Sequence, residues 1–263
     1  MAACGCVLST HPPSSHIHPM PAQPHQYWIP PHVRVCPLLA STVLLDLKRN
    51  RYFGLGMQET RALSTLALNW TEANSNATAV ERLEPDAALA MADALVEAGL
   101  LSRDAPADSA AFGAAPLDLD GALSSAGHEL SRNARLRLAH VASFIAAIAW
   151  ARKALRSRSL YAIACELRER KTGATAGSFD EQRAIELVGI FRRLRPHAFA
   201  ARDRCLFHSL ALVRFMARQS LFPTWVIGVR TQPWGAHAWV QQGRLLLDAN
   251  PEHVYEYAPI LTV

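Results

Sequence analysis

Three residues near the end of the sequence could together perform cysteine-dependent acyl transfer. Cys205 precedes an apolar segment, 206–219, that is typical of a helix, and Asp203 is a good N-cap for it. The first helical turn offers unpaired N–H groups and the positive end of the helix dipole, which favour a thiolate. His237 lies in the strand-like run Ala-His-Ala-Trp-Val, and Asp248 ends the next apolar run. A nucleophile, a base and a carboxylate that orients the base form the activated-nucleophile pattern.

The spacing of the two strand-like runs supports a direct contact between His237 and Asp248. Gln242 and Gly243 form a two-residue hairpin signal between the runs. With these two residues as the loop, His237 faces Asp248, and opposed residues on one sheet face have Cβ atoms roughly 4.5–5.5 Å apart. His208, one helical turn after the cysteine, is a competing base without an evident carboxylate partner. The alternative is a buried cysteine and a hydrogen-bonded strand histidine that have no catalytic role.

The composition predicts a globular protein of a reducing compartment. The chain has 263 residues, of which 50% are hydrophobic, enough for a substantial core. Its five cysteines form no CxxC pair, which favours the cytoplasm over a disulfide framework or a zinc site. The apolar run 141–151 is too short to span a membrane and predicts a buried helix. Residues 1–28 are rich in proline and histidine and predict a disordered tail, with metal binding as the less favoured alternative.

The next region, 29–105, predicts a small winged-helix-like module. Strands are expected at 33–35, 42–46 and 51–54, with a basic turn at 48–50, and helices at 57–70 and from Pro85 to a C-terminal glycine, Gly99. Winged topologies also bind DNA. The segment 57–99 is rich in Glu and Asp, however, and would repel phosphates, so nucleic-acid binding is disfavoured.

A linker at 106–127 separates this module from a helical region that is rich in basic residues. Helices are expected at about 129–158, 160–171 and 180–194. Lys and Arg outnumber Asp and Glu between Arg132 and Arg204. These cations predict either a solvated helix face or a phosphate-binding surface, and the chain has no GxxxxGK[ST] loop to decide between them.

The last part of the chain resembles a known family. The segments that carry the resemblance are Arg-Cys-Leu-Phe-His-Ser-Leu at 204–210, Trp-Val-Ile-Gly-Val at 225–229, His-Ala-Trp-Val at 237–240 and Leu-Asp at 247–248. In this order and spacing they resemble the transglutaminase-like cysteine proteases of lasso-peptide biosynthesis, the B proteins. The resemblance covers about 192–263 well and the helices before it loosely. It places the family's catalytic residues on Cys205, His237 and Asp248.

This resemblance implies a fold and a function. The fold is α+β, with the winged-helix-like module followed by a papain- or transglutaminase-like cysteine protease domain at 128–263. The function is removal of the leader from a ribosomally made lasso-peptide precursor, a step of antibiotic biosynthesis. The family also implies an asparagine-synthetase-like cyclase as partner and dependence on ATP and Mg²⁺, with no membrane partner and no metal bound by the catalytic residues.

The N-terminal module is similar to the peptide-recognition domain of many peptide-modifying systems, through its hairpin at 44–55 and the run Ala-Gly-Leu-Leu at 98–101. Such domains bind a leader peptide by adding its strand to a sheet edge. The resemblance implies leader-binding pockets near Tyr52, Phe53 and Leu63. Two other functions are compatible with the sequence, namely acyl transfer to an amine, as in transglutaminases, and a peptide-binding adaptor without catalysis.

Overall fold

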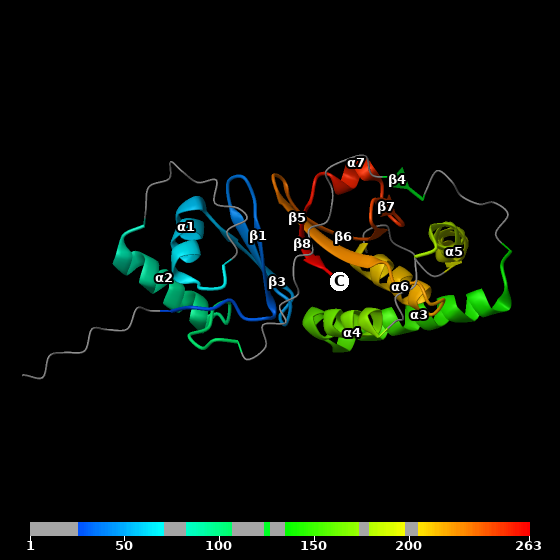
Figure 1. Cartoon of the computed structure of the whole chain (residues 1–263), viewed down its shortest axis with the longest axis horizontal. Helices are drawn as coiled ribbons and strands as arrows, with labels where there is room; N and C mark the ends of the chain where they lie inside the picture. Colours follow the sequence, from blue (N-terminus) through cyan, green and yellow to red (C-terminus); the bar gives the residue numbers. More distant parts are fainter. Residues whose placement is uncertain (1–25, 71–82, 107–123, 127–134, 174–178, 198–204) are drawn as a thin grey trace, which may run out of the picture.

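The computed structural model describes residues 26–70, 83–106, 124–126, 135–173, 179–197 and 205–263. It shows the expected mixed α+β architecture, with two mainly antiparallel sheets that lie next to each other and helices at both ends (Figure 1). The predicted order, a small sheet with two helices followed by helices and a larger sheet, is confirmed.

The N-terminal sheet has three strands in the order β1-β2-β3, where β1 is Val33–Pro37, β2 is Thr42–Asp46 and β3 is Arg51–Leu55. Local chemistry fixes the β2–β3 turn. The buried Asp46 carboxylate accepts hydrogen bonds from the N–H groups of Lys48 and Arg49, at 2.8 and 3.1 Å. Asn50 adopts a φ of 53°, which asparagine tolerates better than most residues.

Two helices cover one face of this sheet, α1 (Met57–Leu66) and α2 (Pro85–Glu97). After α2 the chain turns through Gly99, whose φ of 73° is the left-handed conformation that a helix C′ position favours. Tyr27 is 1% exposed, and its hydroxyl donates to Asp93 at 2.7 Å. The folded module therefore begins before residue 29, since a buried aromatic side chain and its hydrogen bond tie this segment to α2.

The other face of the N-terminal sheet is packed into the main hydrophobic core of the C-terminal half. Cys36, Val43, Leu45 and Leu47 belong to that core, together with residues of the C-terminal helices and the second sheet. The N–H of Tyr161 also donates to the Leu47 carbonyl at 3.0 Å. The two regions that the sequence separates therefore share one core.

The C-terminal half contains four long helices, which are α3 (Leu138–Ser157), α4 (Leu160–Thr172), α5 (Glu181–Leu194) and α6 (Cys205–Ala217); a short turn of 3-10 helix, η1 (Arg195–His197), follows α5. α6 packs on α3, on α5 and on the sheet. Inside this contact the Trp225 indole N–H donates to the Ser209 hydroxyl at 2.9 Å. Burial of α6 on several sides fixes its position.

The helix α3 is longer than the expected apolar run. It has 20 residues, and an 18-residue window within it has a mean hydropathy of 1.3, which by length and composition alone would permit a membrane span. Its inner face, which includes Phe144, Ala147 and Ala151, is packed in the core, as expected for a buried helix.

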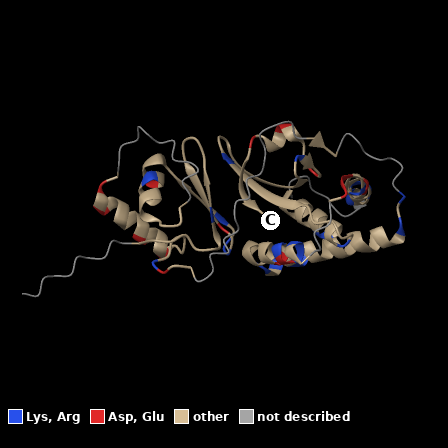
Figure 2. Cartoon of the chain, viewed as in Figure 1, with Lys and Arg blue, Asp and Glu red and all other residues tan. Residues whose placement is uncertain are grey.

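The basic residues of this half are spread over several helices, and Figure 2 shows blue and red segments side by side on α4. Glu166 on this helix forms ion pairs with Arg158 and Arg170. Part of the positive charge is therefore used in surface pairing, as the solvated-face interpretation requires.

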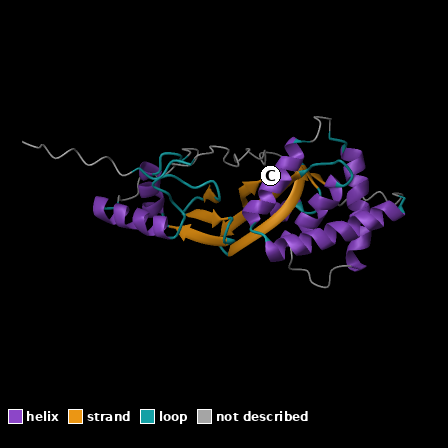
Figure 3. Ribbon diagram, turned by 90° about the horizontal axis from the view of Figure 1, so that it is seen from below, coloured by secondary structure: helices purple, strands orange, loops and turns teal. Residues whose placement is uncertain are grey.

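The second sheet has the strand order β4-β7-β6-β5-β8. Figure 3 shows long, curved strands in orange beside the helices. The central strands are β5 (Thr224–Thr231) and β6 (Trp234–Gln242), flanked by β7 (Leu245–Leu246) and β8 (Ala258–Thr262). A short helix, α7 (Pro251–Val254), follows β7. The outer strand β4 is Ser124–Ser125, which lies in the expected linker and pairs in parallel with β7. The end of the expected linker is thus part of the second sheet.

The predicted register of the β6–β7 hairpin is wrong. Gln242 pairs with Leu245 and Gln241 with Leu246, so the two loop residues are Gly243 and Arg244. Gly243 has a φ of 53° and occupies the first loop position, where type II′ turns favour glycine. The pairing is therefore displaced by two residues, and the displacement separates the histidine and the aspartate that were expected to face each other.

Gly228 on β5 lies on the face of the second sheet that is opposite to α6. A substitution there tests how closely this face is packed. A Cβ at this position would lie 2.7 Å from the Trp239 ring and 2.9 Å from the Tyr257 Cβ, whereas at Gly54 on β3 it would meet no atom within 4 Å. We expect Gly228→Ala to lower the free energy of unfolding by about 1–3 kcal/mol, as overpacking does. Urea denaturation measures this, with Gly54→Ala as control. An equal effect of the two substitutions would contradict the close packing.

Candidate active site

One cavity of about 170 Å³ brings the three predicted catalytic residues together. Its walls come from α5, η1, α6, β6 and the segment after β7. The lining residues are Val188, Phe191, Arg192, Arg195, Cys205, His208, Leu212, His237, Ala238, Leu247 and Asp248. A nucleophile, two imidazoles and a carboxyl group therefore face one space.

Cys205 is the first residue of α6, as the sequence predicts, and it is half-buried. The expected N-cap, Asp203, lies outside the described residues. In the described part of the chain no hydrogen bond joins the thiol to His237; catalytic hydrogen bonds often tighten only when a substrate binds. The position of Cys205 at a helix start is the feature that suits it to nucleophilic attack.

His237 reaches the cavity around an edge of the sheet. Strand alternation places its neighbours Ala238 and Val240 in the core beside α6, and Trp239 in the cluster on the opposite face. Because β7 pairs only with the last two residues of β6, the edge at His237 is not covered by that strand. His237 can thus line the same cavity as Cys205, although its side chain starts from the face of β6 that is opposite to α6.

Aromatic rings hold the imidazole of His237. The His253 ring is centred 4.7 Å away, Tyr257 lies at 5.5 Å and Trp239 is stacked at 5.9 Å. Burial, with a smaller contribution from the charge of His253, lowers the pKa of His237 to about 4. The imidazole is therefore neutral at pH 7, the form that accepts a proton.

Asp248 does not bond to His237 among the described residues. Its carboxylate instead accepts a hydrogen bond from the Val240 N–H at 2.7 Å, in line with the displaced hairpin register. Although the side chain opens on the cavity, protein atoms surround it closely, and burial raises its pKa to about 7, against the opposing effects of Val240 and Arg192. The expected direct orientation of His237 by Asp248 is thus corrected, since Asp248 acts on the backbone of β6.

The sequence reasoning missed the cationic wall of this cavity. Arg192 on α5 and Arg195 in η1 line it, and Arg192 donates to the Leu247 carbonyl at 3.2 Å. The sequence shows that this region is basic, but composition does not show which arginines face Cys205. That information lies in the helical spacing that starts at Val188. The cavity also contains His208, which was recognised as a competing base.

The three residues expected to bind the leader do not form one surface. Leu63 is 0% exposed within the core of the helices α1 and α2. Phe53 packs on the same side, against the cluster of Leu44 and Leu100. Tyr52 lies on the other face, packed against the main core and against the Trp234 ring, at 5.4 Å. Successive strand residues face opposite sides, which explains the separation of Tyr52 and Phe53.

Tyr52 is instead close enough to Cys205 for the charge of the thiolate to affect the pKa of the tyrosine. Burial raises the pKa of Tyr52 to about 12, and the charge of the Cys205 thiolate adds to this shift. A residue of the N-terminal sheet therefore lies near the candidate active site.

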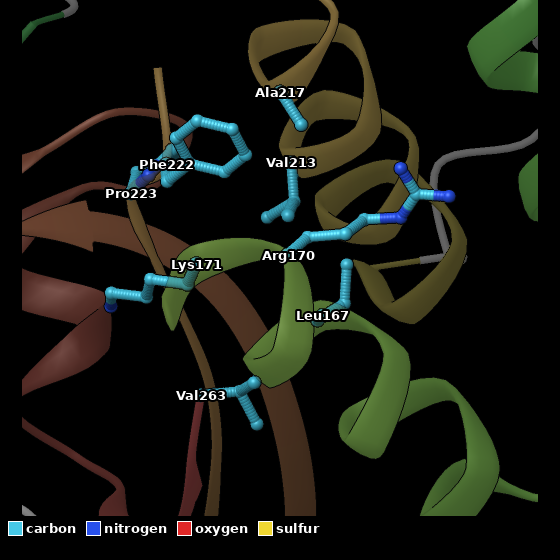
Figure 4. A pocket seen from close by; sticks show the side chains of 8 residues that line it. All are labelled: Leu167, Arg170, Lys171, Val213, Ala217, Phe222, Pro223 and Val263. Carbon is cyan, nitrogen blue, oxygen red and sulfur yellow. The ribbon is translucent and has the colours of Figure 1, made fainter. Parts of the chain in front are cut away.

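A second cavity, between α4, α6 and the C-terminal strand, is too small for a substrate (Figure 4). Its volume is about 10 Å³, the space of a single water molecule at most. Lys171 extends away from it, and its ammonium donates to the Thr224 hydroxyl at 3.0 Å. In the described part of the chain, no group of three His, Cys, Asp or Glu side chains is placed to hold a metal ion.

Comparison with known proteins places this site in a family. Residues 142–262 match the model of the transglutaminase-like superfamily. No curated protein and no solved structure matches the chain. The chain therefore carries a transglutaminase-like domain that runs from α3 to β8 and contains the whole candidate site. This family is consistent with activity of the cysteine protease or acyltransferase type.

The pKa of Asp248 predicts how stability depends on pH. In the folded protein this carboxyl remains protonated up to about pH 7, whereas unfolding returns it to an ordinary pKa of 3.8. Its contribution to stability therefore falls as the pH rises from about 4 to about 7. An asparagine at this position can still accept from the Val240 N–H. We expect Asp248→Asn to raise the free energy of unfolding at pH 8 by about 1–3 kcal/mol relative to the wild type.

Denaturation by urea at pH 4 and at pH 8 measures this difference. At pH 4 the gain should be much smaller, because the wild-type carboxyl is then protonated in the folded state and close to half protonated in the unfolded state. His237 adds its own pH dependence, but equally in the two proteins, so the comparison isolates Asp248. An equal gain at both pH values would contradict the raised pKa.

Proposed function

We propose that this protein is a cysteine leader peptidase that cleaves the precursor of a ribosomally made lasso peptide. The observation that carries this proposal is that Cys205, at the start of α6, shares one cavity with His237 and Asp248 in a transglutaminase-like domain. The resemblance of the segments around these residues to the lasso B proteins supports the choice of substrate.

The neutral imidazole of His237 is suited to accept the thiol proton of Cys205. The sulfur then attacks the scissile carbonyl carbon and forms a tetrahedral intermediate. The protonated His237 gives its proton to the amide nitrogen as the C–N bond breaks, which leaves a thioester on Cys205. Water, deprotonated by His237, attacks the thioester and releases the acid. Asp248 is a positioning residue here, because it fixes the backbone of β6 at Val240, three residues from the base.

The N-terminal module would bind the leader on the outer edge of β3. This strand ends the sheet order, and no described strand pairs with its free edge. Main-chain hydrogen bonds at such an edge give affinity, and nearby pockets give specificity. The shared core holds this edge at a fixed distance from Cys205, an arrangement that suits cleavage at a defined point of the precursor.

The further partner and the cofactors follow from the family resemblance alone. They are an asparagine-synthetase-like cyclase, ATP and Mg²⁺, in the cytoplasm. The described residues do not fit a nucleotide site, because they contain neither a glycine-rich phosphate loop nor a cluster of metal-binding side chains. No step of the proposed mechanism uses the nucleotide.

Acyl transfer is a second candidate function, favoured by the match to the transglutaminase-like superfamily. It shares the thioester intermediate and differs only in the acceptor, which is an amine in place of water. Incubation with the precursor peptide encoded by a short reading frame next to the gene distinguishes the functions by mass. Loss of the leader supports hydrolysis, a mass gain at an amine supports transfer, and an unchanged peptide supports an adaptor.

The roles of the two histidines can be separated with this peptide. We expect His237→Ala to lower the single-turnover cleavage rate by at least about 10²-fold, as removal of a general base does, and His208→Ala to lower it far less. Cys205→Ala should abolish cleavage while leaving leader affinity unchanged. The reverse ranking of the histidine variants would assign the base to His208.

Leader docking on β3 can be tested by hydrogen–deuterium exchange on the full chain. Because an added strand pairs with outward-facing amides, addition of leader peptide should slow exchange within Arg51–Leu55. The strand Val33–Pro37, at the opposite end of the sheet order, is the internal control. Slowed exchange in β1 alone, or no change in either strand while the peptide is bound, would contradict docking at β3.

A further inference from the structure

We propose that Arg192 and Arg195 form an anion subsite in the catalytic cavity that receives a carboxylate side chain of the peptide substrate next to the cleaved bond. The inference rests on the proposed peptidase function and narrows its substrate class to peptides with Asp or Glu near the cleavage point. Neither arginine is needed for the cysteine–histidine chemistry itself.

The two guanidinium groups belong to one wall of the cavity. Arg192 lies near the end of α5 and is half-buried, and Arg195, in η1, is exposed at the rim. The hydrogen bond from Arg192 to the Leu247 carbonyl fixes that side chain beside Asp248. Among the described residues, no carboxylate lies within ion-pair distance of either arginine. Within the described part of the chain neither charge is used in an ion pair, although both arginines lie close enough to Asp248 to lower its pKa.

Below about pH 7 the other titratable groups of the cavity offset little of this charge. Asp248 is the one carboxyl among the lining residues, and burial keeps it largely protonated below about pH 7. His237, with a pKa of about 4, is neutral there. His208, if protonated, would add positive charge, and ionised Cys205 would be the remaining anion. Charges of one sign in a partly closed cavity focus the potential on a ligand of opposite sign.

The remaining lining suits an amino-acid side chain rather than a small inorganic anion. Val188, Phe191, Leu212 and Leu247 supply apolar surface in a volume of about 170 Å³. A Glu or Asp side chain has apolar methylene groups for this surface and a planar carboxylate that matches the fork of an arginine. Because Cys205 lines the same cavity, the carboxylate would bind near the reacting carbonyl.

The test compares two thiol reagents of nearly equal size, iodoacetate, which carries a carboxylate, and iodoacetamide, which is neutral. The measured quantity is the ratio of their rates at Cys205, followed by mass spectrometry of the full chain at pH 6.5. A ratio cancels any change in thiol reactivity that affects both reagents. We expect Arg195→Gln to lower this ratio at least about fivefold, and Arg195→Glu to lower it further. Arg193→Gln, an exposed neighbour on α5 outside the cavity, is the matched control and should leave the ratio unchanged.

The outcomes separate this inference from the proposed function. If neither reagent modifies Cys205 ahead of Cys36 and Cys165 in the wild type, the nucleophile of the proposed function is wrong. If Cys205 is selectively modified but Arg195→Gln leaves the ratio unchanged, or Arg193→Gln lowers it equally, the anion subsite is overturned and the peptidase proposal stands.

Peptides give a second measurement that identifies the carboxylate. The peptides are made in pairs that carry Glu or Gln at one position within three residues of the cleaved bond. Their C-termini are amidated, so that the two peptides of a pair differ only in the charge of this side chain. At one position the Glu peptide should have the higher kcat/KM in the wild type and lose this advantage in Arg195→Gln. Equal rates for Glu and Gln at every position would overturn the subsite.

Discussion

The burial of α6 is the constraint on which the candidate site depends. This helix carries core side chains around most of its circumference, including Leu210, Leu212 and Phe215, and packs against α3, α5 and the sheet at once. A helix held on so many sides has little freedom to shift or rotate without loss of dense packing. Its first residue, Cys205, is therefore held at one place beside β6 and α5. The elements that bring His237 and the arginines to the cavity are the same elements that enclose the helix.

Burial also sets the protonation states of the site. The same close packing that positions His237 lowers its pKa to about 4, and at Asp248 it raises the pKa to about 7. Both groups are thereby biased toward their neutral forms, as expected when charged groups lose water. A neutral histidine has a lone pair that can accept a proton, although its lowered pKa makes it a weaker base, and a largely protonated aspartate leaves the arginines as the dominant charges. The electrostatic character of the cavity thus follows from packing more than from direct ion pairing.

The sequence predicts those parts of the fold that local chemistry determines. The β2–β3 turn follows from Asp46 and Asn50, and the end of α2 follows from Gly99, because each residue type satisfies a local backbone requirement. The hairpin register was not predictable in this way, since a glycine at 243 suits the first or the second position of a two-residue loop. The hydrogen bond from the Val240 N–H to the Asp248 carboxylate, which favours the first position, is visible only in the structure. Strand alternation and helix packing direct the side chains of Tyr52, Phe53 and Leu63 into separate cores, so the structure does not bring them onto one surface.

The shared core changes how the N-terminal module relates to catalysis. A module joined by a linker would deliver the leader to the protease by raising its local concentration, with a wide range of accessible geometries. Here Val43, Leu45 and Leu47 are buried among the residues that also surround α6, and Tyr52 lies near Cys205. A peptide strand added to β3 would therefore start from a fixed position relative to the nucleophile. Under the proposed function, the distance across this core would set the length of precursor between the leader strand and the cleaved bond.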